Sequence, residues 1–126
     1  MINITLWVLQ GLLALGFLAH GWLYLRPPAE MVEQMNAAIN PSFRMFIGVA
    51  EVLAAIGLIV PGITRVMPGL VPAAAAGLMI VMIGATVFHV SRSEISSAAV
   101  TAVLLALVSF VAYARWRVRP IVPRTA

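Results

Sequence analysis

The chain has 126 residues, of which 63% are hydrophobic and 10% are charged, and its formal net charge is +4. Soluble domains usually carry about 25% charged residues, and small ones leave much of their surface in water, so this composition excludes an ordinary soluble fold. Cysteine is absent, which excludes disulfides, thiolate catalysis and cysteine-bound metal within the chain. All 8 basic residues are arginines at the ends of apolar stretches, a pattern that favours membrane anchoring and argues against nucleic-acid binding.

Four apolar stretches are long enough to cross a bilayer, and they cover residues 4–25, 43–60, 68–90 and 97–114. Each is close to the ~20 residues that span ~30 Å of hydrocarbon, and in lipid such a segment satisfies its own backbone as a helix. The sequence therefore predicts an all-α integral membrane four-helix bundle, with one transmembrane domain over residues 1–126. The first stretch has no basic residue before it and no clear cleavage site, so we expect a retained helix rather than a signal peptide.

The connections between these stretches differ in character. Pro27-Pro28 is expected to end the first helix, and residues 29–40 then alternate polar and apolar side chains at helical spacing. We predict a short amphipathic helix here, lying on the membrane or capping the bundle, with an apolar face formed by Met31, Val32, Met35 and Ile39. Pro61-Gly62 is expected to end the second helix and to open a tight turn.

Arginine placement predicts the orientation of the chain. Four spans put both ends on one side, together with Arg65 and the arginines at 115, 117, 119 and 124. The opposite side holds Arg26, Arg44 and Arg92. Because cytoplasmic loops carry the excess of positive charge, we predict a multi-pass cell-membrane protein with both ends in the cytoplasm.

Few ionisable side chains lie in or near the spans: His20, Arg44, Glu51 and His89. A charge at mid-bilayer costs roughly 2.5–3.5 kcal/mol, so such residues usually face a partner or a cavity. The predicted topology places all of them in the outer half of the bilayer, on three helices. We take Glu51, His20 and His89 as candidate catalytic residues, and Arg44, Glu51 and His89 as candidates for binding a cofactor.

Each of these residues also has a structural interpretation. Glu51 can be a neutral carboxyl that hydrogen-bonds two helices together, because burial favours its protonated form. His20 and His89 can be ordinary boundary residues near the headgroups, and Arg44 can be an anchor that extends to them. Two histidines on separate helices could bind haem, whereas a few scattered residues predict no metal site.

Residues 47–61, IGVAEVLAAIGLIVP, resemble the G-x-x-E-x-x-x-A-x-G-L-x-x-P signature of DoxX-like membrane proteins. Residues 75–85, followed by His89, Arg92 and Glu94, are similar to the third helix of that family and its outer end, and residues 6–18 also fit. The resemblance covers most of residues 4–116.

This resemblance implies a four-helix membrane bundle in a bacterial inner membrane. It also implies links to quinone-coupled oxidation of sulfur compounds and to membrane redox or thiol homeostasis. Glu51 and His89 stand at matching motif positions, so a family site would include them. Two departures limit the transfer: many members have a lysine near the end of the first helix, where this chain has Tyr24, and His20 occupies a position that is often apolar.

Two functions from different classes follow. In the first, the protein binds a quinone-like or other lipophilic molecule in a polar pocket in the outer half, as an accessory subunit with a partner redox protein. In the second, it is a small membrane enzyme, such as an isomerase, a cyclase or an epoxide-opening enzyme, in which Glu51 and a histidine perform acid–base chemistry. A haem protein and a purely structural scaffold are further alternatives for the function. A homo-oligomer is an alternative for the state of assembly.

Overall fold

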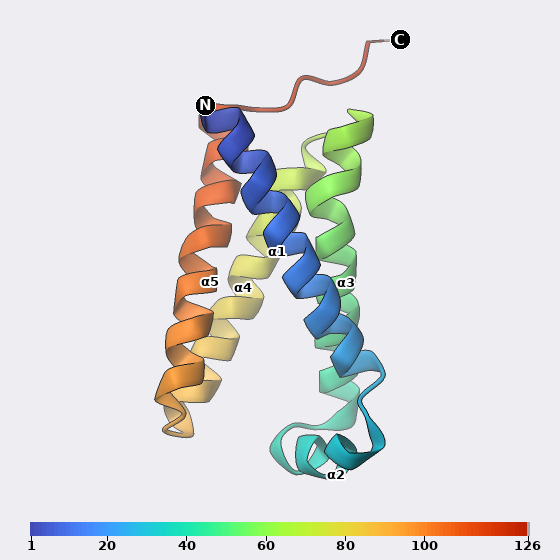
Figure 1. The fold of residues 1–126 in the computed structure, drawn as a ribbon, viewed down its shortest axis with the longest axis vertical. Helices are drawn as coiled ribbons and strands as arrows, with labels where there is room; N and C mark the ends of the chain where they lie inside the picture. Colours follow the sequence, from blue (N-terminus) through green and yellow to red (C-terminus); the bar gives the residue numbers. More distant parts are fainter. Residues whose placement is uncertain (126) are drawn as a thin grey trace.

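The computed structural model describes residues 1–125 and is all-helical, as predicted. Four long helices run alternately up and down: α1 (Ile2–Leu25), α3 (Pro41–Thr64), α4 (Leu70–Ser91) and α5 (Ile95–Tyr113). A short π-helix, η1 (Ala114–Val118), continues α5. Both ends of the described chain lie at one end of the bundle, called here the terminal end, and α2 (Ala29–Ala38) lies at the other, the α2 end (Figure 1).

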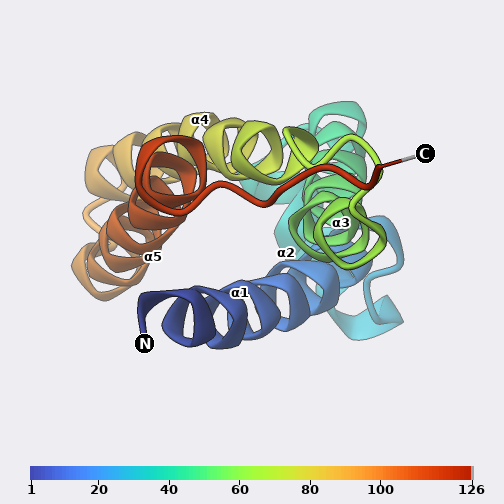
Figure 2. The ribbon, with the colours of Figure 1, turned by 90° about the horizontal axis from the view of Figure 1, so that it is seen from above.

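The helices form two pairs. Helix α1 packs mainly on α3, and α4 packs mainly on α5, while α3 and α4 join the pairs and α1 meets α5 only weakly. Viewed along the bundle, the two pairs stand side by side (Figure 2). Apolar side chains from all four long helices make one core, which includes Leu6, Leu13, Phe17, Leu58, Leu78, Met82 and Val108.

The outer surface of the long helices is apolar. Leu12, Leu53 and Ile80 are exposed, and they are three of many large hydrophobic side chains that point away from the core. Four helices are long and apolar enough to cross a membrane: Ile2–Leu25, Pro41–Thr64, Leu70–Ser91 and Ile95–Val118. Lipid tails can cover such an apolar surface, and helices form all their backbone hydrogen bonds internally within lipid. The protein is therefore a multi-pass membrane protein.

The short helix α2 matches the predicted amphipathic segment. Its larger apolar side chains, Met31, Val32 and Met35, are half-buried, while Glu30, Glu33, Gln34 and Asn36 are exposed. The next helix starts with a standard cap, since the Asn40 side chain accepts a hydrogen bond of 2.9 Å from the Ser42 amide and Pro41 occupies the first turn.

Two predicted helix ends were wrong. Helix α3 continues through Pro61 to Thr64 and ends at Arg65, whose backbone is left-handed with φ 57°. Proline removes only one helical hydrogen bond, and membrane helices tolerate that loss. The last helix begins at Ile95 and continues through η1 to Val118, beyond the predicted end at residue 114.

Candidate functional site

His20 and Glu51 form a hydrogen-bonded pair between α1 and α3. Nδ1 of His20 lies 2.6 Å from Oε2 of Glu51. The Glu51 side chain is 1% exposed, whereas that of His20 is 48% exposed. The carboxyl is therefore buried between two helices, and the imidazole connects it to the outer surface of the bundle. Both residues were predicted as site residues, and the structure brings them together.

A close helix crossing positions this pair. A Cβ atom on Gly21 would lie 2.9 Å from the Gly48 carbonyl oxygen and 3.1 Å from Cβ of Glu51. A Cβ atom on Gly48 would in turn lie 2.9 Å from the Gly21 carbonyl oxygen. Only glycine leaves room for two backbones at this separation. Gly21 follows His20 in the sequence, and Gly48 lies one helical turn before Glu51. The close crossing therefore sets the short distance between His20 and Glu51.

Arg44 and Tyr24 lie beside the pair at the α2 end. The ring of His20 is tilted against that of Tyr24, with centroids 4.4 Å apart. Arg44 is buried and donates from Nη1 to the backbone oxygen of Tyr24, while its Nε has no partner in residues 1–125. Arg44 therefore ties the start of α3 to the end of α1. The ion pairs within 4 Å in the described chain do not join it to Glu51.

His89 belongs to a different group, so the structure does not bring it together with Glu51, the residue with which it was grouped as a candidate. Its Nδ1 lies 2.9 Å from Oε1 of Glu94, and Arg92 lies 3.5 Å from the same oxygen. The reason is the packing of the helices, since the end of α4 turns directly into α5. The hydrogen bond from His89, followed by the charge of Arg92, holds the pKa of the Glu94 carboxyl below its ordinary value.

A third polar group, formed by Gln10 and Arg115, was not predicted from the sequence. Gln10 is fully buried and donates to the Leu58 carbonyl at 2.7 Å, while its Oε1 accepts from Nε of Arg115 at 2.6 Å. Arg115, which the sequence suggested was only a topology signal, is 2% exposed. The available signal was Gln10 itself, a lone amide among the apolar residues of the first stretch. An amide in lipid needs a hydrogen-bonding partner.

The model of the DoxX-like family matches residues 8–111. The chain belongs to the DoxX-like family. The matched residues include His20, Glu51, His89 and Glu94, and they leave out Asn3 and Arg115. No curated protein and no solved structure matches the chain.

The His20–Glu51 pair has two possible proton arrangements, and they differ in whether Nε2 of His20 accepts or donates a hydrogen bond. When Glu51 is ionised, Nδ1–H of His20 donates to it and Nε2 is free to accept a hydrogen bond. When Glu51 is protonated, it donates to Nδ1 and Nε2–H becomes a donor. In this DoxX-like protein, Nε2 of the half-exposed His20 can thus accept a hydrogen bond from a hydroxyl or donate one to a carbonyl. Residues 1–125 contain no group of three or more His, Cys, Asp or Glu that could hold a metal ion.

Proposed function

We propose that the protein binds a quinone-like or other lipophilic carbonyl compound at the His20–Glu51 pair. The observation that carries this proposal is the 2.6 Å bond between a buried carboxyl and a half-exposed imidazole within the apolar helices. A lipophilic ligand reaches this flank of α1 from the bilayer. Its polar end meets Nε2 of His20, and its rings or tail lie on apolar side chains, the usual composition of such sites.

The pair fits both oxidation states of a quinone. A quinol hydroxyl donates to Nε2 when Glu51 is ionised, and a quinone carbonyl accepts from Nε2–H when Glu51 is protonated. Oxidation of a quinol releases two protons and two electrons. One proton goes to Nε2 while the proton on Nδ1 passes to Glu51, and the other proton goes to water at the membrane surface. The electrons go to a partner redox protein, so the chain acts as the binding and proton-accepting subunit of a membrane redox system.

Decylubiquinone titrated into the detergent-purified protein, with tryptophan fluorescence as the readout, tests this proposal. Trp22 is two residues from His20 in α1 and exposed, so it can report a ligand that binds on this part of the helix. We expect saturable binding that weakens about tenfold in His20→Phe, because a buried polar group left without its hydrogen bond costs about 1–3 kcal/mol. His89→Phe is the matched control, since it removes the other histidine and leaves the pair intact. Equal affinities for both variants would disprove the assignment.

The same geometry supports a second function, that of an acid–base enzyme. A buried carboxyl 2.6 Å from an imidazole is a suitable proton donor and acceptor pair for isomerisation or epoxide opening. Turnover of a lipophilic epoxide that is lost in Glu51→Gln and retained in Glu94→Gln would favour this function. The haem alternative gains no support from the geometry, because His20 and His89 pair with different carboxylates on different helix pairs. A Soret band in the purified protein would reverse that ranking.

A further inference from the structure

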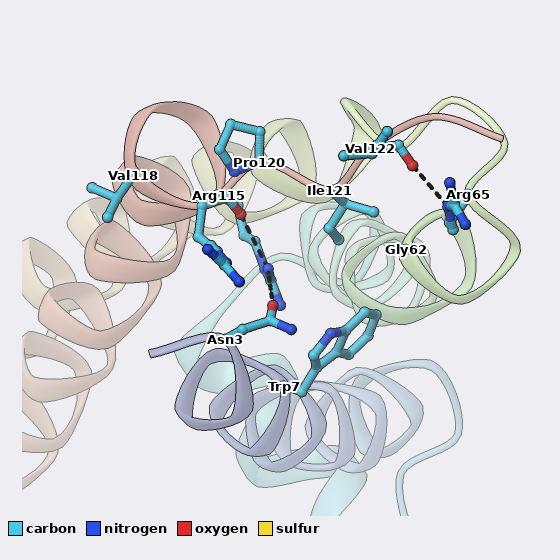
Figure 3. A pocket seen from close by; sticks show the side chains of 10 residues that line it. Asn3, Trp7, Gly62, Arg65, Arg115, Val118, Pro120, Ile121 and Val122 are labelled. Carbon is cyan, nitrogen blue, oxygen red and sulfur yellow. Dashed lines mark hydrogen bonds between the residues drawn. The ribbon is translucent and has the colours of Figure 1, made fainter. Parts of the chain in front are cut away.

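A hollow of about 590 Å³ lies at the terminal end of the bundle (Figure 3), whereas His20 is near the opposite end of α1 (Ile2–Leu25). Asn3 and Trp7 of α1 form one side of it, and the segment that follows η1 forms the other (Figure 3). Three arginines, Arg65, Arg115 and Arg119, contribute to its lining. The hollow therefore combines a high density of positive charge with an aromatic ring and apolar walls.

Arg115 is the buried centre of this hollow. It donates from Nε to Gln10, and from Nη1 to Asn3 at 2.8 Å and to the Arg119 carbonyl at 3.1 Å. The guanidinium also lies over the Trp7 ring, 5.1 Å from its centroid. All of these partners are neutral. Its Nη2 is buried and has no hydrogen-bond partner in residues 1–125.

No acidic side chain accompanies these arginines. The four acidic residues are glutamates, and Glu30 and Glu33 are in α2, Glu51 is midway along α3, and Glu94 is in the α4–α5 turn. An arginine keeps its charge in any protein environment. A buried guanidinium with neutral partners and one free N–H group is costly, so an anion from outside the chain would stabilise it.

The walls of the hollow are held in place by hydrogen bonds and tight packing. Arg65 donates to the carbonyls of Val122 at 2.9 Å and Pro123 at 3.2 Å, and its own carbonyl accepts from the Arg124 amide at 2.8 Å. These bonds fasten the segment after η1 across the end of α3. Below it, Trp7 packs so closely on Gly62 that a Cβ atom there would lie 2.6 Å from the ring.

We propose that this hollow binds a phosphate group, held by Arg115 and Arg119. Guanidinium groups match phosphate oxygens with paired, charge-assisted hydrogen bonds, and the free Nη2 of Arg115 supplies a donor that the protein leaves unused. The phosphate belongs either to the headgroup of an anionic phospholipid or to a soluble phosphate compound. The lipid is favoured by position, because the hollow adjoins the end of a membrane-length helix and has Trp7, Ile121 and Val122 in its wall.

Native mass spectrometry of the full chain in detergent tests the proposal, with dioleoylphosphatidylglycerol as probe and dioleoylphosphatidylcholine as its zwitterionic match. The informative variant is Arg119→Gln, because this exposed side chain makes no hydrogen bond in the described chain and its loss leaves the Arg115 contacts intact. Arg115→Gln removes the buried donor as well. Arg117→Gln is the control, since Arg117 has the same charge at the same end but stacks on Trp116, outside the hollow.

We expect phosphatidylglycerol to bind saturably and at least tenfold more tightly than phosphatidylcholine. Arg119→Gln should weaken that binding about tenfold, and Arg117→Gln by less than about twofold, because screened surface charges contribute little. Displacement of the lipid by millimolar inorganic phosphate would support the site and identify a soluble phosphate compound as its ligand. Retention of the lipid under that challenge would identify the headgroup. Equal retention of the two lipids, or equal losses in Arg117→Gln and Arg119→Gln, would overturn the proposal.

Discussion

The crossing of α1 and α3 makes a quantitative prediction about Gly21. In Gly21→Ala the new methyl group would lie 2.9 Å from the Gly48 carbonyl oxygen, 2.9 Å from Cγ2 of Val52 and 3.1 Å from Cβ of Glu51. One of these atoms belongs to the backbone and another is a rigid Cβ, so α1 must move away from α3. Overpacking of this kind costs about 1–3 kcal/mol, against a helix-propensity gain of about 1 kcal/mol for replacing glycine with alanine.

Gly16→Ala isolates the packing effect. Gly16 is in the same helix, and a Cβ atom there has no neighbour within 4 Å. The gain in helix propensity is shared by both variants, so the difference in their free energies of unfolding equals the packing cost, about 1–3 kcal/mol. Thermal or denaturant unfolding in one detergent measures this difference. If Gly21→Ala is as stable as Gly16→Ala, the close crossing and its role in positioning His20 are refuted.

Three further predictions concern a buried amide, a carboxyl in the α4–α5 turn and the orientation of the chain in the membrane. Gln10→Leu should destabilise the fold by about 2–3 kcal/mol, because it leaves the buried Arg115 with fewer acceptors, whereas unfolding of the exposed control Gln34→Leu should be unchanged. Glu94 has a lowered pKa, so its bonds stabilise the α4–α5 turn above the ordinary carboxyl pKa and are lost as pH falls through the lowered value. In His89→Phe, carbon NMR should show the pKa of the Glu94 carboxyl move upward. An unchanged pKa of Glu94 in this variant would contradict the prediction. Because the chain lacks cysteine, the single variants Thr125→Cys and Ser93→Cys report its orientation directly. An impermeant maleimide should label Ser93→Cys in intact cells, and Thr125→Cys only after lysis. The reverse pattern would place the terminal end outside the cell.

Hydropathy and helix length were enough to predict the fold. The four apolar stretches became the four long helices because lipid leaves a segment of that composition few alternatives. The amphipathic segment followed from its spacing of apolar residues in the same way. The end of α3 could not be predicted from Pro61, because a membrane helix can continue through a proline, as α3 does to Thr64.

The candidate site was only partly predictable. Because a carboxyl in lipid is costly, the sequence identified Glu51 as a candidate that needs a partner. The predicted topology placed His20 in the same half of the bilayer. The sequence could not specify which helices pack together, and this pairing decides that Glu51 meets His20 whereas His89 meets Glu94. Glycines show the same limit: a Cβ atom on Gly48 or Gly57 would lie 2.9 Å from a neighbouring helix, whereas a Cβ atom on Gly84 would have no neighbour within 4 Å.

The two proposed sites are separable in the structure, and this separation makes each one easier to test. The His20–Glu51 pair lies within the α1–α3 pair and inside the residues that match the DoxX-like family. The hollow depends on Asn3, Trp7, Arg115 and Arg119, which lie outside that match. Arg115 of η1, which continues α5, bonds to Gln10 and Asn3 of α1 at the terminal end. It therefore joins the two helix pairs, where α1 and α5 otherwise meet only weakly. A phosphate bound there would strengthen this junction without touching the pair, and its effect on stability should therefore persist in His20→Phe.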